Sequence, residues 1–453
     1  MIVKRFFEPL IAQNSYLIGC AAADEAIVID PNRDVQQYID AAEAADLQIT
    51  HVAETHIHAD FLSGARELAR RTGARLCLSD EGDANWKYQY DHDRKLKDGD
   101  RITIGNVKLD VLHTPGHTPE HITFLVTDGA VADQPIAAVT GDFVFVGDVG
   151  RPDLLEKAAN MAGTMEAGAR TLWASLQKLK PYHDWLQIWP GHGAGSSCGK
   201  GISAVPHSTL GYERLFNWAF TSKSEADFVQ NVLSGQPDPP PYFAVMKRLN
   251  RDQGSGIGDQ GVGIREVQSA IGETVSKGGL VIDTRPAVEY AKAHVPGTLN
   301  IPLNGSFVTW AGWLIPYDRD FYLVTDRIEE VRKALALIGL DRIAGYFPPA
   351  AAAGIETIEQ MSVDELAKSG PSNGIVVIDV RNDSEWSEGH IPNAVHIPLG
   401  QLAQRIDEVP ATDNVVVQCQ GGGRSSIAAS LLKKMGRKNV ANLAGGYRAW
   451  QAQ

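Results

Sequence analysis

The sequence predicts an α/β protein with an N-terminal α/β sandwich and two further α/β domains, and three observations support this. Short β-rich runs alternate with helical stretches from residue 1 to about residue 245. A glycine-rich, polar stretch, residues 250–263, is typical of a linker. Beyond the linker, one sequence pattern occurs twice. The chain has 453 residues, which is more than one hydrophobic core usually supports.

The expected strands of the N-terminal part are short β-rich runs, most of them followed by polar residues. They are SYLIG (15–19), EAIVID (25–30), ITHVAE (49–54), RLCLS (75–79), KLDVLH (108–113), ITFLV (122–126), IAAVTG (136–141) and QIWPG (187–191). The stretch FLSGARELARRTG (61–73) is expected to be helical. Polar residues just after strands indicate the loops on which an α/β sandwich exposes its active site.

Composition and charge argue against several classes of protein. The net charge of -13 argues against nucleic acid or an anionic membrane as a partner. No apolar stretch approaches the ~20 residues that a membrane span requires. The N-terminal MIVKRFFEPLIAQNSYLIGC has a basic start, but polar residues and a proline interrupt it. This interruption favours a strand over a signal peptide.

The cysteines are few and widely separated. They are Cys20, Cys77, Cys198 and Cys419, with no C-x-x-C spacing among them. This pattern is too sparse for a disulfide scaffold and indicates a reducing compartment, so a cytoplasmic protein is expected. Cys20 and Cys77 lie at the end of one expected strand and within another, and both are expected to be core thiols.

The C-terminal half contains an internal repeat. LVIDTRPAVEYAKAHVPGTLNIPL (280–303) matches VVIDVRNDSEWSEGHIPNAVHIPL (376–399) at a fixed offset of 96 residues. The matched positions include an Asp, an Arg, a Glu, a His and an Ile-Pro-Leu end. Such matching predicts two copies of one α/β module, with Pro348 and Pro349 near the seam.

Four polar segments at expected strand ends carry histidine or aspartate. They are ETHIHAD (54–60), HTPGHTPEH (113–121), TGD (140–142) and WPGHG (189–193). Alternating positions on an extended loop can aim the first two histidines and the aspartate inward together. Any one of these histidines alone is more simply a core or surface residue. Together they predict a metal site built from His56, His58, Asp60, His117, Asp142 and His192.

Residues 1 to about 245 resemble a metallo-β-lactamase superfamily domain, and GDVGRPDL (147–154) resembles its persulfide dioxygenase branch. The resemblance implies an αββα sandwich. The family's usual metal-binding run is H-x-H-x-D-H, but this chain has Phe61 at the last position. Phenylalanine cannot bind a metal, so a stable second metal is not expected.

The resemblance implies that His56, His117 and Asp142 hold one metal. Two histidines and one carboxylate with open positions are typical of non-haem Fe(II) that activates O2, so one Fe(II) per chain is expected, with Zn²⁺ as a substitute. The remaining polar residues, His58, Asp60 and His192, would orient these ligands and hydrogen-bond water or substrate.

Three further residues are candidates for substrate contact or sulfur relay near the metal. Cys198 and Lys200 lie in SSCGKG (196–201), and Arg151 lies in GDVGRPDL. A thiol there could relay sulfur, and a lysine could attract an anionic persulfide. The alternative is a loop with an incidental cysteine.

A second chemical motif lies in VVVQCQGGGRSSIAASLLKKMG (415–436), which reads as strand, glycine-rich loop and helix. Cys419 lies at the strand end, and the helix N-terminus favours its thiolate. The glycines let the backbone curl around the sulfur, and Arg424 adds charge. The expected loop residues are Gln420, Gly421, Gly422, Gly423 and Ser425. A phosphate-binding loop would need a Lys-Ser/Thr pair, which this loop lacks.

This Cys-x4-Arg loop and its upstream motifs resemble a rhodanese domain over residues 353–453. In the first repeat, FYLVTDRIEE (321–330) aligns with the loop and puts Thr325 or Asp326 where the cysteine should be. The first copy is therefore expected to be inactive and to serve structure or docking. The expected domains are 1–248, a linker at 249–264, an inactive rhodanese-like domain at 265–350 and an active one at 353–453.

The combined resemblance implies a persulfide dioxygenase fused to a sulfurtransferase. The expected substrates are O2 and a persulfide of glutathione, coenzyme A or a similar thiol, and the expected products are sulfite and thiosulfate, in sulfide detoxification by a homo-oligomer. Two alternatives are a zinc thiolester hydrolase of the glyoxalase II kind and a persulfide carrier that needs only Cys419.

Overall fold

The computed structural model describes residues 1–154, 163–236, 238–252, 263–369, 374–410 and 414–453. Residues 253–262 of the expected linker therefore lie outside the described part. The chain divides into two compact units, one of residues 1–259 with 336–339 and one of residues 260–335 with 340–453. The expected domains and their boundaries stay predictions.

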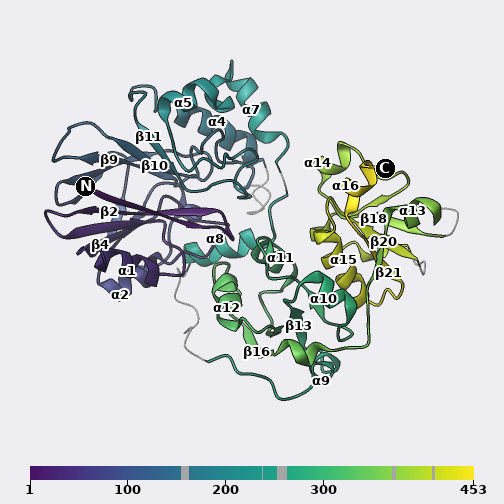
Figure 1. Ribbon diagram of the computed structural model, residues 1–453. Coiled ribbons are helices and arrows are strands. Elements are labelled where there is room, and N and C mark those ends of the chain that lie inside the picture. Colours follow the sequence, from purple (N-terminus) through teal and green to yellow (C-terminus); the bar gives the residue numbers. More distant parts are fainter. Residues whose placement is uncertain (155–162, 237, 253–262, 370–373, 411–413) are drawn as a thin grey trace. The chain divides into compact units, whose positions relative to one another are not determined.

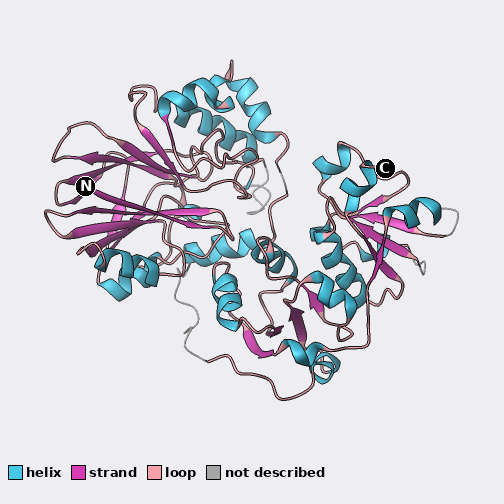
Figure 2. Ribbon diagram, in the orientation of Figure 1, coloured by secondary structure: helices cyan, strands magenta, loops and turns pink. Residues whose placement is uncertain are grey.

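The first unit contains two six-stranded sheets (Figures 1 and 2). The first sheet runs in sequence order through β1 (Ile2–Glu8), β2 (Gln13–Cys20), β3 (Glu25–Ile29), β4 (Gln48–Ala53), β5 (Arg75–Ser79) and β6 (Arg94–Leu96). The second sheet contains β7 (Arg101–Ile104), β8 (Val107–His113), β9 (Ile122–Asp128), β10 (Ala137–Gly141), β11 (Gln187–Pro190) and β12 (Ser208–Thr209). Strand β1 confirms the strand expected at the N-terminus.

The helices of the first unit cover the outer faces of the two sheets (Figure 2). They are α1 (Gln36–Glu43), α2 (Ala65–Thr72), α4 (Thr164–Gln177), α5 (Leu210–Phe216), α6 (Trp218–Thr221) and α7 (Glu225–Leu233). Helix α8 (Tyr242–Asp252) lies instead against the loop after β4, where Asn250 donates to the carbonyls of His58 and Phe61. Helix α2 is shorter than expected. It begins after Gly64 and ends at Gly73, whose φ of 72° lies in the left-handed region that glycine adopts readily.

The side-chain alternation of the strands divides the first unit into layers. In β2, Tyr16 and Ile18 join a core between the two sheets, whereas Leu17 joins a second core beneath α1 and α2. A third core lies between the second sheet and its helices, and it includes Leu172 and Phe228. The layers are therefore αββα, as expected.

The second unit contains two parallel sheets with flanking helices. The first sheet contains β13 (Leu280–Asp283), β14 (Leu299–Asn300), β15 (Phe321–Val324) and β16 (Ile343–Phe347), with helices α9 (Ile271–Ser276), α10 (Ala287–Lys292), α11 (Phe307–Leu314) and α12 (Ile328–Ala336). The second contains β17 (Glu359–Met361), β18 (Val376–Asp379), β19 (Val395–His396), β20 (Val415–Gln418) and β21 (Val440–Leu443), with helices α13 (Val363–Ser369), α14 (Asp383–Ser387), α15 (Gly423–Lys434) and α16 (Gly446–Gln451).

The sequence repeat is also a repeat of contacts. Arg285 forms an ion pair with Asp283 at 2.7 Å and donates to the carbonyl of Ala293. Arg381 forms the same ion pair with Asp379, also at 2.7 Å, and donates to the carbonyl of Gly389. The Asp-x-Arg pattern that the two copies share therefore joins the end of a strand to the end of the next helix in each.

Every helix that the structure describes is too short or too polar to cross a membrane.

Candidate metal centre and sulfur-transfer loop

Three strand ends bring a potential metal-binding set together. His56 follows β4 of the first sheet, while His117 and Asp142 follow β8 and β10 of the second. One side-chain donor atom of each lies within 4.8 Å of the others, and all three residues are buried. Oδ2 of Asp142 lies 3.5 Å from Nε2 of His117 and 4.0 Å from Nε2 of His56. The structure thus places the three expected ligands around one point.

The opposite ring nitrogens of these histidines are already engaged. Nδ1 of His56 lies 3.0 Å from the Thr55 hydroxyl, and Nδ1 of His117 lies 3.0 Å from the Arg151 carbonyl. A carbonyl only accepts, so Nδ1 of His117 donates and Nε2 keeps its lone pair. Among the described residues, Nε2 of His56 and Oδ2 of Asp142 are buried without a hydrogen-bond partner. Such atoms fit a metal ion.

The electrostatics favour the metal-binding forms of these side chains. Burial, reinforced by the charge of His58, lowers the pKa of His56 well below its ordinary value, so its imidazole is neutral. Burial opposes ionisation of Asp142, but the charge and hydrogen bond of His192 outweigh it and hold the pKa of this carboxyl well below its usual range. A neutral imidazole and an ionised carboxylate are the forms that bind metals.

The other three expected site residues surround this set. Nδ1 of His192 lies 2.7 Å from Oδ1 of Asp142, and its Nε2 lies 2.7 Å from Oδ2 of Asp60 in a contact that is not aligned as a hydrogen bond. His58 turns away, with Nε2 3.2 Å from Asp30 and its ring centroid 4.2 Å from that of His56. His192 therefore orients Asp142 directly, whereas His58 packs its ring against His56 and contacts Asp30.

Phe61 is fully buried, and its ring centroid lies 4.3 Å from that of His58. It fills space beside the site and offers no donor atom. The structure nevertheless forms a second cluster, because donor atoms of Asp60, His192 and Cys198 lie within 4.8 Å of one another. The sequence reasoning did not foresee Cys198 as a partner of these two residues, since nothing in the local pattern of SSCGKG indicates it.

The three candidate substrate residues differ in where they point. Burial, with the charges of Asp60 and Asp142, raises the pKa of Cys198 well above its ordinary value, so the thiol is protonated. The Lys200 ammonium donates to the carbonyls of Asn231 and Ser234 and lies over the Trp218 ring, so its charge is engaged there.

Arg151 is fully buried and pairs with Asp153 at 2.7 Å. Its guanidinium also donates to the Ser197 carbonyl at 3.1 Å. Its contribution to the site is the backbone carbonyl that accepts from His117. Arg151 therefore supports the ring of His117 and the loop that precedes Cys198.

Two residues of the site were not singled out from the sequence. Asp30, at the end of β3, accepts from the Thr55 backbone and hydroxyl and faces His58. His121 accepts from the Asp142 backbone N–H at 3.2 Å. Both follow the same strand-end rule as the foreseen residues. Asp30 ends EAIVID, and His121 ends HTPGHTPEH.

The glycine-rich loop of the second repeat holds the Cys419 sulfur. Cys419 follows β20, and its Sγ accepts from the Gly422 N–H at 3.1 Å and from the Ser425 hydroxyl at 3.4 Å. Gly422 has a φ of 95°, which an L side chain rarely adopts. A Cβ on Gly446 would lie 2.0 Å from the Cys419 carbonyl oxygen, so that position also requires glycine.

Arg424 is held by a partner that the sequence reasoning did not identify. Its guanidinium makes two hydrogen bonds of 2.6 Å to the two oxygens of Glu385. Gln420 accepts from Arg381 at 3.3 Å, which ties the loop to the Asp-x-Arg motif. Around Gly421 and Gly423 there is open space where a side chain would lie. The loop is therefore anchored at its charged residues and open at its glycines.

In the first repeat, the strand register identifies the residue at the cysteine position. Asp283 pairs with Val324 on β15 as Asp379 pairs with Gln418 on β20. Thr325 therefore occupies the position of Cys419. Its hydroxyl accepts from the Arg327 N–H at 3.0 Å.

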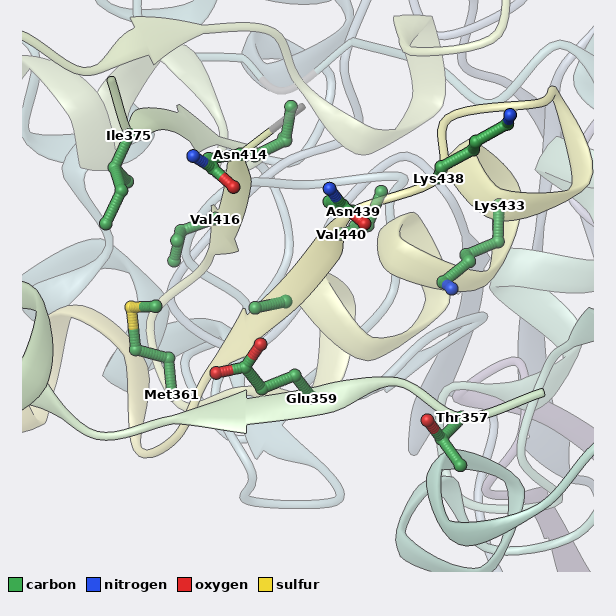
Figure 3. Close-up of a pocket in the computed structure, with 12 residues that line it drawn as sticks. Thr357, Glu359, Met361, Ile375, Asn414, Val416, Lys433, Lys438, Asn439 and Val440 are labelled. Carbon is green, nitrogen blue, oxygen red and sulfur yellow. The ribbon is translucent and has the colours of Figure 1, made fainter. Parts of the chain in front are cut away.

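A cavity of about 410 Å³ lies at the amino end of the second repeat's sheet, away from Cys419 (Figure 3). Ile375, Asn414 and Asn439, which line it, immediately precede β18, β20 and β21. Cys419 follows the carboxyl end of β20, so this cavity lies away from the sulfur. Lys433 in its wall is paired with Glu356 at 3.1 Å.

The αββα layers, with a buried cluster of histidines and aspartates at their strand ends, define a metal-binding domain, joined here to a repeated α/β module with one sulfur-holding loop. Comparison with known families agrees. Residues 9–192 match the metallo-beta-lactamase superfamily, and residues 362–453 match the rhodanese-like domain. The chain belongs to the metallo-beta-lactamase superfamily and carries a rhodanese-like domain in its C-terminal part.

Individual relatives cover different parts of the chain. A probable metallo-hydrolase of Burkholderia pseudomallei is 31% identical over 40% of this chain and 68% of its own length. The mitochondrial persulfide dioxygenase ETHE1 of Bos taurus is 28% identical over 51% of this chain and 80% of its own length. Several other curated relatives are matched over only 51% to 60% of their length.

Among solved structures, a metallo-beta-lactamase from Staphylococcus aureus is 42% identical. It covers 77% of this chain and 99% of its own, with a TM-score of 0.70. This match extends beyond the length of the metallo-beta-lactamase domain alone.

Proposed function

We propose that the protein is an iron-dependent persulfide dioxygenase joined to a thiosulfate sulfurtransferase. The observation that carries the proposal is the set of His56, His117 and Asp142. It offers one carboxylate and two imidazoles that burial keeps neutral by lowering the pKa of each histidine. An Fe(II) ion held by such a set supplies O2 activation when bound. The substrate class is a low-molecular-weight thiol persulfide, and the two halves share sulfur-containing intermediates.

The chain's own residues prepare the site for this chemistry. The Arg151 carbonyl and the Thr55 hydroxyl fix the two imidazole rings, and His192 fixes Asp142. Burial of every side chain in the set excludes bulk water, which protects a reactive sulfur species from side reactions. The relative from Bos taurus, named as a persulfide dioxygenase, supports this choice of substrate.

In the second half, Cys419 would carry a sulfane sulfur between the persulfide, sulfite and thiosulfate. Gly422 N–H and the Ser425 hydroxyl converge on Sγ, and the first turn of α15 follows them. Covalent linkage raises the effective concentration of one site's product at the other.

One second candidate function is favoured by a specific observation. The cluster of Asp60, His192 and Cys198 could complete a two-metal hydrolase, and one relative is named a probable metallo-hydrolase. In that case the two sets of residues would hold two metal ions, which would supply activation of water for hydrolysis of a thiolester. Phe61 weighs against this candidate because it offers no donor at the position where the resemblance expects a ligand.

Metal analysis paired with two activity assays tests the proposal. Protein purified without oxygen should contain one iron per chain and consume O2 with glutathione persulfide. Asp142→Ala should lose both, since it removes the only carboxylate of the set. Two tightly bound zinc ions per chain in protein that hydrolyses a glutathione thiolester would reject the dioxygenase in favour of the hydrolase.

A further inference from the structure

The second unit contains a cavity of about 550 Å³ that both repeats line. The first repeat contributes, among others, Trp310, Thr325 and Asp326, and the second contributes Gly423, Arg424 and Ile427. The degenerate loop of one repeat and the active loop of the other therefore share one space. A volume of this size is typical of sites for small organic molecules.

Direct contacts hold the two repeats together around this cavity. The backbone N–H of Asn300 on β14 donates to the Ser430 hydroxyl on α15 at 3.1 Å, and both residues are fully buried. The ring of Trp313 packs so closely on Gly400 that a Cβ there would lie 2.4 Å from it. The first repeat thus packs along the helix that begins at the sulfur-transfer loop.

The cavity lies directly beside the atoms that hold the reactive sulfur. The Gly422 N–H contacts Sγ of Cys419, and the next two residues, Gly423 and Arg424, form part of the cavity wall. Open space surrounds Gly423 where a side chain would lie. A molecule in the cavity can therefore approach the loop from the side on which the glycines leave room.

The lining suits the organic body of a thiol better than a small inorganic anion. Trp310, Leu303 and Ile427 give it apolar and aromatic surface. Its three arginines are already engaged, because Arg285 pairs with Asp283, Arg327 with Glu330 and Arg424 with Glu385. Thiosulfate and sulfite carry two or nearly two charges on very few atoms, so this lining offers them little.

We propose that this cavity binds the body of a low-molecular-weight thiol that exchanges sulfur with Cys419, and that the first repeat has become the docking half of the sulfurtransferase. The proposal rests on the sulfurtransferase part of the proposed function. In the exchange, the acceptor thiolate attacks the outer sulfur of the Cys419 persulfide. The new S–S bond forms as the Cys419 S–S bond breaks, Cys419 leaves as a thiolate, and the persulfide proton stays on the transferred sulfur. No oxidant is required.

Two variants with opposite effects on the cavity test this. Trp310→Ala removes an aromatic wall, and Ala287→Trp fills space at the start of α10. With thiosulfate as donor, both should raise the KM for glutathione or coenzyme A about tenfold. The KM for thiosulfate, and the rates with cyanide or dithiothreitol as acceptor, should stay unchanged because these molecules are too small to need the cavity. Circular dichroism checks that both variants fold.

The cavity in Figure 3 supplies a matched control. Lys438→Ala alters its lining at the opposite end of the same sheet and should leave every KM unchanged. Competition by S-methylglutathione and by desulfo-coenzyme A separates the two thiol carriers, since only the molecule that fits the cavity should inhibit, and only in wild-type protein.

Unchanged KM values for both thiols in both variants would overturn the proposal, as would an equal loss with every acceptor including cyanide. A wild-type protein without any thiosulfate sulfurtransferase activity would instead reject the proposed function of the second half.

Discussion

Replacing Ser425 with alanine should slow sulfur transfer through Cys419 about tenfold while leaving the fold intact. The Ser425 hydroxyl lies 3.4 Å from Sγ of Cys419, and the residue is fully buried in the first turn of α15. Alanine keeps the helix and removes a single oxygen. What is lost is one of the two hydrogen bonds that the sulfur accepts.

The magnitude follows from the charge on the sulfur. A hydrogen bond to a charged group contributes about 1.5–3 kcal/mol. The lower end applies here, because the contact is long and the hydroxyl proton is shared with the Gly422 carbonyl at 3.1 Å. About 1.4 kcal/mol corresponds to a factor of ten. The effect should fall on the formation and release of the thiolate, so kcat should drop more than the KM for the acceptor rises.

Ser426→Ala is the matched control. Ser426 is the next residue, and its hydroxyl also donates to the Gly422 carbonyl, at 2.8 Å, but no described contact joins it to the sulfur. The assay is thiosulfate sulfurtransfer to cyanide, with thermal unfolding measured in parallel. A Ser425→Ala enzyme within twofold of wild type, or a Ser426→Ala enzyme equally slow, would refute the idea that this hydroxyl stabilises the sulfur.

Three further outcomes are expected. Cys419→Ser should keep the initial O2 uptake with persulfide but change the main product from thiosulfate to sulfite, which thiol-reactive labelling of the products measures; an unchanged ratio would mean that the two sites act independently. Glu120→Gln should remove a pH dependence of stability. Burial raises the pKa of Glu120 to about 7, so ionisation of this carboxyl in the unfolded chain lowers its contribution to stability by about 3 kcal/mol between pH 4.5 and 7, and denaturant unfolding at both pH values should show a change in stability that is less favourable in wild type than in the variant by this amount. Phe61→Ala should lower the stability of the first unit by about 3–5 kcal/mol, since it empties a fully buried site; a loss below about 1 kcal/mol in urea unfolding would show that the site collapses around it.

The strands that could be predicted from sequence are those with strong local patterns. EAIVID and RLCLS became β3 and β5 within one residue, because both are short, mostly apolar runs flanked by residues typical of turns. Strands β6 and β12 were not foreseen. They have three and two residues, and pairing with a neighbouring strand forms them rather than any property of their own sequence.

The site was predictable to the extent that its residues follow strands. His56, His117 and Asp142 meet because the two sheets bring their strand ends to one edge, and their assignment as ligands stays a prediction until metal is measured. Side-chain pairs that form only through long-range contacts left no recognisable pattern in the sequence. Glu385 lies 39 residues before Arg424, and nothing in the sequence pairs them. Lys200 shows that a position near the site in sequence does not establish a role there. Its place soon after His192 suggested a substrate contact, but its ammonium donates to the carbonyls of Asn231 and Ser234.

The origin of the metal-binding set from both sheets has a mechanical consequence. His56 follows a strand of one sheet, and His117 and Asp142 follow strands of the other. A bound ion would therefore cross-link the two sheets of the sandwich at their edge. Neither half contains the whole set, and the ion can be captured only after the halves have docked. Metal binding would then occur late in folding and would select correctly docked sheets, because incorrectly docked sheets do not form the binding site. The same cross-link should raise the force needed to separate the two sheets more than the force needed to unfold the domain along its strands. Single-molecule pulling from two pairs of anchor points would measure this difference.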